Sequence, residues 1–322
     1  MDIGRTRKNK DLQDVKLTGF HNTVIDCKNV LLRNIERLVR NKGTLRTRFP
    51  REKTMTIKMS VLAAMLFAAT AAFGQSEVTL TRIDCGTGAK PAAIERWSDT
   101  DAYGKDFKLT FTFSCYLIKH GSDYMVWDTG YAPGSNPSAP TVGIVERLKE
   151  LNVTPGQVKY VGVSHFHADH TGQLTNFADA TLLLGKGDWE GITANPPMQG
   201  ANAVAYEPWT KLGGKREVLT LDKDVFGDGS VVVLRTPGHT PGHSSLLVRL
   251  KEMGAVILTG DAVHFHENYE SNGVPGFNFD RAQTLASLDR IKKLAANLKA
   301  TVIIQHDMRD IGKLPAFPAA AK

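Results

Sequence analysis

Short runs of apolar residues, bounded by glycine, proline and polar residues, recur along the chain from residue 78 onward. Runs of this length that are rich in valine, isoleucine, leucine and aromatic residues are typical of β-strands. The predicted strands are 78–83, 107–118, 124–127, 158–163, 181–184, 231–234, 246–250, 255–258 and 301–304. The body of the chain is therefore expected to be built on β-sheets.

Two segments show the periodicity of amphipathic helices instead. Residues 142–151 place valine and leucine on one face at every third position, and residues 280–298 repeat such a face with leucine, isoleucine and alanine. Each half of the body thus gives strands, then a helix, then a strand. This order predicts an α/β (α+β) fold in which two αβ halves pack sheet against sheet, with helices outside.

Residues 185–215 show no clear period and carry several aromatic side chains. Connections of this length without secondary structure are uncommon in compact domains and are usually functional. We expect this stretch to form either a wall or lid over a site, or an exposed variable insertion.

The first 74 residues differ from the rest of the chain. A charged start at residues 55–60 leads into an apolar, alanine-rich run at 61–72 and small residues before Gln75. These are the features of a secretory signal peptide, and the apolar run is too short for an ordinary membrane span. We interpret residues 55–74 as a signal peptide and residues 75–322 as a folded body that is periplasmic or secreted.

Residues 1–54 precede this signal and hold 14 lysines and arginines against 6 acidic residues. Because a signal peptide normally begins a chain, the simplest hypothesis is that translation starts at Met55 or Met59. N-terminal sequencing of exported protein tests this, and a mature chain that begins near Met1 would contradict it. The alternative is a basic cytoplasmic tail ahead of an uncleaved anchor.

The net charge of the chain, +7, comes from this basic leader, because the other residues sum to −1. A protein that holds nucleic acid in a basic groove shows its excess of lysine and arginine in the folded domain. We therefore expect no nucleic-acid partner, and no stable membrane span after processing. The sequence leaves the oligomeric state open.

Two of the three cysteines, Cys85 and Cys115, lie near the start of the body. An oxidising compartment favours a disulfide between them. Two buried free thiols fit their positions equally well, and the sequence leaves both alternatives open.

Histidine and aspartate side chains gather directly after four of the predicted strands. These residues are His165, His167, Asp169, His170, His239, Asp261 and His306. Loops at strand ends often carry the chemistry of a protein, although a solvated histidine-rich turn is the alternative for residues 165–170. Nitrogen and carboxylate donors without a thiolate suit zinc or a similar divalent ion. Seven donors exceed the needs of one tetrahedral ion and fit two ions that share a carboxylate.

This order of residues resembles the metallo-β-lactamase superfamily, whose motif is His-x-His-x-Asp-His followed by a single histidine, an aspartate and a final histidine. The resemblance covers residues 78–312 and implies a four-layer αβ/βα sandwich with two Zn²⁺, or similar divalent ions, at one edge. It assigns one metal to His165, His167 and His239. It assigns the other to Asp169, His170 and His306, with Asp261 bridging. By analogy, His243 is a structural residue beside the ligands.

The resemblance also implies a mechanism. Two metals ~3.5–4 Å apart lower the pKa of a bridging water to about 7. The resulting hydroxide attacks a carbonyl that one metal polarises. Asp169, beside the bridging position, is the expected proton shuttle to the departing oxygen.

Within the superfamily, the chain looks most like the exported N-acyl homoserine lactone lactonases, which are quorum-quenching enzymes. The similar stretches are 114–118, 127–130, 236–246, 260–262, 274–277 and 284–290. Many of these lactonases carry a tyrosine three residues after the bridging aspartate, where it hydrogen-bonds the substrate carbonyl. This chain has His264 there, and an imidazole can donate the same bond. A surface histidine beside the site is the alternative.

An N-acyl homoserine lactone is a small-molecule substrate with an apolar acyl tail, so an apolar trough is expected beside the metals. The candidate trough residues are Phe166, Trp189, Met198, Phe265 and Phe277.

Other activities remain open. A β-lactamase suits an exported protein, but zinc β-lactamases generally lack the carboxylate ligand that Asp261 supplies here. Hydrolases of thioesters, phosphotriesters or sulfate esters share this aspartate. A non-catalytic metal-binding protein is the remaining alternative, and the complete ligand set argues against it.

Overall fold

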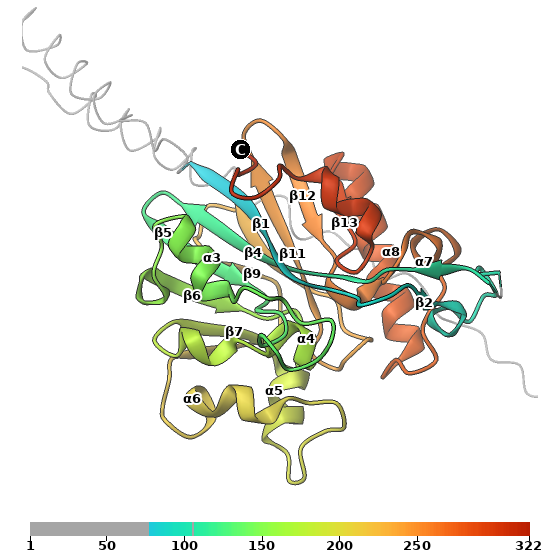
Figure 1. Cartoon of the computed structure of the whole chain (residues 1–322), viewed down its shortest axis with the longest axis horizontal. Helices are drawn as coiled ribbons and strands as arrows, with labels where there is room; N and C mark the ends of the chain where they lie inside the picture. Colours follow the sequence, from blue (N-terminus) through green and yellow to red (C-terminus); the bar gives the residue numbers. More distant parts are fainter. Residues whose placement is uncertain (1–76, 105) are drawn as a thin grey trace, which may run out of the picture. The chain divides into compact units, whose positions relative to one another are not determined.

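The computed structural model describes residues 77–104 and 106–322, so the predicted leader, 1–54, and signal peptide, 55–74, lie outside the described residues. Two mixed β-sheets with flanking helices make up the architecture (Figure 1). Within the described part of the chain, no helix has both the length and the apolar character needed to cross a membrane.

The first sheet has six strands in the order β1-β4-β5-β6-β7-β8. The pairs β1/β4 and β4/β5 are antiparallel, whereas β5 to β8 run parallel. The bounds of the six strands are Val78–Thr87, Thr112–His120, Asp123–Trp127, Val158–Gly162, Thr181–Gly185 and Arg216–Leu219. Parallel strands covered on both faces have nearly continuous apolar sequences, which is why β6 and β7 could be recognised from the sequence.

The second sheet has five strands in the order β13-β12-β11-β10-β9. Only β12 and β13 pair in parallel. From β9 to β13 the bounds are Lys223–Asp224, Val231–Arg235, Ser244–Leu250, Gly254–Leu258 and Thr301–Ile303. A small additional ribbon pairs β2 (Ala92–Ala93) with β3 (Lys108–Leu109).

The two helices predicted from periodicity are α3 and α8, and α8 is the longest helix among the described residues. From α3 to α8 the bounds are Ile144–Glu150, Ala168–Thr171, Lys186–Thr193, Glu207–Thr210, His266–Ser271 and Arg281–Leu298. The 3₁₀ helices η1 to η6 span Glu95–Trp97, Pro155–Gln157, Leu174–Phe177, Ala203–Tyr206, Gly260–Ala262 and Met308–Lys313. Asp280 begins α8 as its N-cap, because its carboxylate accepts a hydrogen bond from the Gln283 backbone NH.

Three apolar cores separate four layers. The central core joins the two sheets through residues such as Trp127 of β5 and Leu246 of β11. A second core lies between the first sheet and its helices and includes Leu148 of α3. The third packs Ile291 of α8 against the second sheet, on the side away from α3 (Figure 1). The predicted helix–sheet–sheet–helix sandwich is confirmed.

Two stretches for which no helix or strand is predicted from the sequence contain short elements. Residues 185–215 hold α5, η4 and α6, and residues 89–106 hold β2 and η1. In α5 the apolar period is interrupted by Gly187 and Gly191, and only Ile192 among its apolar residues is fully buried. Such elements form through contacts with the rest of the fold, so sequence periodicity does not reveal them.

A disulfide joins Cys85 of β1 to Cys115 of β4, which decides between the two alternatives for these cysteines. The turn after β5 packs directly on it. At Gly130, where φ is +61°, a Cβ atom would lie 2.4 Å from the Cβ of Cys85, so only glycine fits. In the same turn, the Thr129 backbone NH donates to the carbonyl of His170 at 2.7 Å. The disulfide therefore supports a turn that contacts a predicted metal ligand.

Candidate metal centre

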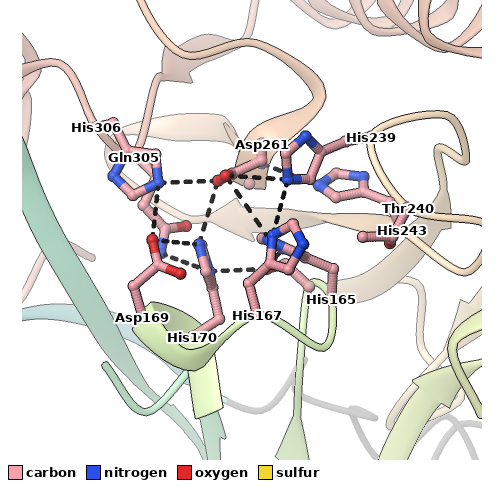
Figure 2. Close-up of polar contacts among 12 residues, drawn as sticks. His165, His167, Asp169, His170, His239, Thr240, His243, Asp261, Gln305 and His306 are labelled. Carbon is pink, nitrogen blue, oxygen red and sulfur yellow. Dashed lines mark hydrogen bonds and ion pairs between the residues drawn. The ribbon is translucent and has the colours of Figure 1, made fainter. Parts of the chain in front are cut away.

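The seven predicted ligands meet at one edge of the sandwich, where strands of both sheets end (Figure 2). The first sheet supplies four of them from the loop after β6 and from α4. In the second sheet, β10, β12 and β13 each end shortly before one ligand. The side chains are those of His165, His167, Asp169, His170, His239, Asp261 and His306.

Three histidines form the first group of ligands. His165 Nε2 lies 2.8 Å from His167 Nδ1, and His239 Nε2 lies 3.1 Å from the same nitrogen. The three ligand atoms all lie within 4.8 Å of one another. Three nitrogens at this spacing are the protein donors of a zinc site that keeps a fourth position open.

The second group contains two histidines and two aspartates. Asp261 Oδ1 lies 3.2 Å from His170 Nε2 and 3.0 Å from His306 Nε2. Asp169 Oδ2 lies 3.5 Å from the same atom of His170 and 3.6 Å from that of His306. Mixed imidazole and carboxylate donors of this kind also suit zinc.

Asp261 lies between the two groups (Figure 2). Its Oδ1 faces the second group, while its Oδ2 lies 3.4 Å from His239 Nε2 and 3.7 Å from His165 Nε2. A carboxylate with one oxygen toward each group is arranged to bridge two ions. The structure thus brings the predicted ligands together in the grouping that the family resemblance implied.

Neighbouring groups hold four of the ligand rings in place. In each ring, the nitrogen turned away from the centre lies within hydrogen-bond distance of a polar atom, and such contacts fix the orientation of a ligand. The partners are Ser164 Oγ for His165 (3.1 Å), Asp128 Oδ2 for His170 (2.9 Å), Asn278 Oδ1 for His239 (3.0 Å) and the Thr112 carbonyl for His306 (2.9 Å).

Asp128, at the end of β5, supports the second group. It is fully buried and its backbone is left-handed, with φ at +55°. Its Oδ1 accepts from the Ser164 backbone NH at 2.7 Å, and its Oδ2 accepts from His170 and, at 3.1 Å, from Gln305 Nε2. Because Gln305 directly precedes His306, Asp128 links the ligand loops of the two sheets through hydrogen bonds.

Asp188, in the first turn of α5, supports the first group. It is fully buried, and its Oδ2 accepts hydrogen bonds from the Phe166 backbone NH (3.1 Å) and the Thr240 hydroxyl (2.9 Å). Its Oδ1 accepts from the Gly242 backbone NH at 2.5 Å. Phe166 and Thr240 each directly follow a ligand of the first group. Burial raises the pKa of Asp188 to about 7, although these hydrogen bonds oppose the shift.

His243 has the structural position that the analogy implied. Its Nδ1 donates to the Thr236 carbonyl at 2.9 Å, and its Nε2 accepts from the Asp261 backbone NH at 2.9 Å. Burial lowers the pKa of His243 to about 3, so the ring stays neutral and can accept this bond. The ring packs against Gly260, where φ is +53° and a Cβ atom would lie 2.7 Å from Nε2.

Burial and charge act differently on the two groups of histidines. Burial lowers the pKa of His165 and His239 well below the ordinary range, so these rings are neutral and present a lone pair to a metal. Burial acts in the same direction on His170 and His306, but the charge of Asp261 and its neighbours reverses it and raises both pKa values. The carboxylates of the second group therefore create a negative electrostatic potential at these two histidines, which a divalent cation can neutralise.

The residues fit two zinc ions. His170 Nε2 and Asp261 Oδ1 are buried and have no hydrogen-bond partner among the described residues. Buried polar atoms are nearly always paired, and a cation at the second group accounts for both of these. The donor set holds nitrogen and carboxylate oxygen without thiolate, which zinc accepts.

Zinc is expected to raise the temperature of thermal unfolding, because the ligands converge only in the folded chain. At a free zinc concentration of about 100 Kd the stabilisation is about 2.7 kcal/mol, or roughly 5–10 °C for a body of this size. Differential scanning calorimetry with zinc and with a chelator measures it. The His167→Ala variant should show a smaller shift, and equal unfolding temperatures with and without zinc would contradict the assignment.

A pocket of about 510 Å³ opens over the ligands. His167, Asp169, His239, Asp261 and His306 form its floor. Aromatic side chains form much of its wall, namely Trp97, Phe111, Phe113, Tyr131 and Phe277. The Trp97 ring lies in the middle of this wall, with its centroid 4.9 Å from that of Phe111 and 4.8 Å from that of Phe277.

Of the five predicted trough residues, the structure places only Phe277 on the pocket wall. Phe166 is buried in the core beside the first sheet, and Trp189 and Met198 pack against that core. Phe265 is fully buried and packs edge-on against the ring of Phe111, behind the wall.

His264 lies at the pocket, and it is buried rather than on the surface. Its Nε2 lies 3.2 Å from Asp261 Oδ2, and its ring centroid lies 4.7 Å from that of Trp97. Only 1% of the residue is exposed, and neither ring nitrogen has a hydrogen-bond partner among the described residues. His264 therefore presents a buried imidazole beside the bridging carboxylate, with Nε2 near Asp261 Oδ2.

Sequence reasoning missed the supporting aspartates and most of the wall. Asp128 could have been found, because a lone acid follows an apolar strand in the run Asp128-Thr129-Gly130. Asp188 carries no such signal, since it lies among glycines in a stretch without a period. The wall residue Trp97 belongs to a 3₁₀ turn whose position depends on distant residues.

Comparison with known families agrees with this geometry. The protein-family model described as the metallo-beta-lactamase superfamily matches residues 113–306 of this chain. The chain belongs to the metallo-β-lactamase superfamily. Among curated relatives, N-acyl homoserine lactonase AttM of Rhizobium radiobacter is 33% identical over 239 residues, which cover 67% of this chain and 90% of that protein.

Solved structures share the metallo-β-lactamase fold. A quorum-quenching N-acyl homoserine lactone lactonase superposes with a TM-score of 0.65 at 24% identity, over 76% of this chain and 98% of that one. AidC, described as a dizinc quorum-quenching lactonase, superposes with a TM-score of 0.58 at 15% identity, over 77% of this chain and 91% of that one. At these identities the likeness concerns the fold.

Proposed function

We propose that this metallo-β-lactamase superfamily member is a dizinc hydrolase that opens the lactone ring of N-acyl homoserine lactones. The observation that carries the proposal is Asp261, whose two oxygens face two complete sets of ligands beneath an aromatic pocket. The lactonase specificity is supported by the relative AttM, an N-acyl homoserine lactonase that is 33% identical to this chain.

Two zinc ions held by these ligands would supply an activated water and polarise a carbonyl group. The residues that line the pocket then determine which substrate is bound and how it is oriented. The aromatic wall places an acyl tail over the ligand floor and excludes water around it. A substrate held in this way presents its lactone carbonyl to the floor, between His264 and Asp169.

Asp169 is placed to carry a proton. Its side chain is 18% exposed and lines the pocket, in contrast to the buried Asp261. Burial by itself raises the pKa of Asp169, but the charges of His170 and His306 lower it to about 2, so without metal its carboxylate is ionised. Asp169 would take the proton of the attacking water and return it to the alkoxide oxygen that leaves when the ring C–O bond breaks.

His264 is placed to donate a hydrogen bond to the substrate carbonyl. The His264→Phe variant is expected to lower kcat about 10-fold, the equivalent of one hydrogen bond of about 1.4 kcal/mol. Tyrosine has nearly the same shape as phenylalanine and carries a hydroxyl donor, so the His264→Tyr variant should recover most of the lost kcat. Steady-state kinetics at equal zinc content measures both, and equal kcat values for the Phe and Tyr variants would contradict this role.

A panel of substrates tests the proposed function. The purified, zinc-loaded protein is compared on N-hexanoyl homoserine lactone, a cephalosporin and a glutathione thioester, beside its His167→Ala variant. We expect turnover of the lactone that zinc chelation and His167→Ala abolish. Fast cephalosporin or thioester turnover with an inert lactone would assign the protein to the other activity.

We also propose that the protein acts outside the cytoplasm. The Cys85–Cys115 disulfide supports an oxidising compartment, and residues 55–74 have the composition of a signal peptide.

A further inference from the structure

The pocket above the metal centre has an uneven distribution of charge. Its lining includes two cationic side chains, Lys90 and Arg96. Among the residues that the structure describes, the acidic side chains that line it are the predicted metal ligands Asp169 and Asp261. The two cationic side chains thus lie outside the ligand set, which holds both acidic side chains. Because the chain after residue 54 is close to neutral overall, these cations do not reflect a generally basic surface.

Both cationic side chains lack an ionic partner. Lys90 and Arg96 are exposed, and neither forms an ion pair or a side-chain hydrogen bond with any residue that the structure describes. The Arg96 guanidinium carbon lies 5.4 Å from the centroid of the Trp97 ring, so its charge lies at the aromatic wall. An unpaired cation at a pocket wall attracts a negatively charged group on a bound molecule.

The backbone that carries these residues is fixed to the rest of the site. On one side of Lys90, the Gly88 backbone NH donates to the Phe111 carbonyl at 2.8 Å. Beyond Arg96, the Trp97 carbonyl accepts from Asn268 Nδ2 at 2.6 Å. The two charges therefore extend from an anchored segment rather than from a free loop.

We propose that Lys90 and Arg96 form a subsite for a carboxylate, or a similar anionic group, at the far end of the acyl chain. This inference rests on the proposed lactonase function. The reacting lactone lies on the ligand floor, the carbon chain lies along Trp97 and Phe277, and the terminal anion meets the two cations. The preferred substrates are then acyl homoserine lactones whose tails are acidic.

The test compares two lactones with tails of six carbons, N-hexanoyl and N-adipoyl homoserine lactone, of which only the second ends in a carboxylate. For the wild-type protein at low salt, the ratio of kcat/KM for adipoyl over hexanoyl is expected to exceed that of Lys90→Met/Arg96→Met by about 5- to 10-fold. The change should appear in KM with kcat retained, and it should shrink at high salt. A matched control, Lys119→Met/Lys251→Met, removes two exposed charges that do not line the pocket and should leave the ratio unchanged.

Equal ratios in the wild type and the Lys90→Met/Arg96→Met variant would overturn the subsite. If neither lactone is hydrolysed, the proposed function fails, and the subsite is tested separately by calorimetry with the ring-opened compounds, N-adipoyl and N-hexanoyl homoserine. Tighter binding of the adipoyl compound that depends on the two cations would support the subsite without the reaction. Equal binding of the two compounds would overturn the subsite as well.

Discussion

Replacement of Asp261 by alanine is expected to remove the coupling between the two metal positions and to lower kcat/KM by about 1,000-fold or more. The loss of one shared ligand affects both groups, because its oxygens face His170 and His306 on one side and His165 and His239 on the other. Metal ions contribute several kcal/mol to catalysis of this kind, and each 1.36 kcal/mol is a factor of ten in rate.

Zinc content of the purified Asp261→Ala variant, determined by mass spectrometry of the metal, accompanies the kinetic measurement. The variant should retain fewer than two zinc ions per chain. Asp179→Ala removes an exposed aspartate that belongs to none of the ligand groups and is the matched control for the substitution itself. If the alanine variant does not fold by circular dichroism, Asp261→Asn keeps the side-chain volume and tests the same point. Two tightly held zinc ions in a folded Asp261 variant would contradict the bridging role.

The Asp188→Asn variant is expected to weaken zinc binding at the first group, about 10- to 100-fold. Both carboxylate oxygens of Asp188 accept hydrogen bonds, one from Gly242 and the other from Phe166 and Thr240. An asparagine NH₂ must therefore face a donor on one side, and a buried group left unpaired costs about 1–3 kcal/mol. Asp188 joins the loops that carry His165 and His239, so these two loops are expected to move apart in the variant.

The Asp128→Asn variant should affect the second group instead, because Asp128 accepts hydrogen bonds from His170 and Gln305. Titration of each metal-free variant with cobalt, followed by its visible absorption, reports the two positions without any substrate. In each variant we expect one position that binds cobalt tightly and one that binds it weakly. The tight position is the second group in Asp188→Asn and the first group in Asp128→Asn, so the two variants should give different spectra. Identical titrations of the two variants would contradict separate support of the two groups.

The metal centre could be predicted from the sequence because its residues obey a simple rule. A ligand that follows a buried strand is recognisable from the apolar run before it, and four such runs end near histidine or aspartate. His165 and His306 follow strands of different sheets. They could be joined because strand ends at one edge of a predicted sheet sandwich can converge, and because the order of ligands resembles the metallo-β-lactamase motif.

The pocket wall could not be predicted in the same way. Trp97 and Phe111 lie in or beside elements of two or three residues, whose positions depend on contacts with α7 and with Asp307 at the start of η6 rather than on local periodicity. The aromatic residues nearest the ligands in sequence, Phe166 and Phe265, point into the apolar cores. Nearness to a ligand in the sequence therefore did not indicate which aromatic side chains face the substrate.

Asp188 shows a second limit of sequence reasoning. Its function depends on three donors, two of which lie on the loop after β10, more than fifty residues away in the chain. Nothing in its immediate neighbours distinguishes it from a solvated aspartate at the start of a helix. Only the packing of α5 against the ligand loops makes it a buried support.

The most direct test of lactone opening at this site is mass spectrometry of the product formed from N-hexanoyl homoserine lactone in ¹⁸O-labelled water. Attack of water oxygen on the ring carbonyl breaks the ring C–O bond and leaves the label in the new carboxylate. We predict N-hexanoyl homoserine that carries one labelled oxygen in its carboxylate, formed only when zinc is present. Release of hexanoate and intact homoserine lactone, a label on the homoserine hydroxyl, or product formation without metal would contradict the account.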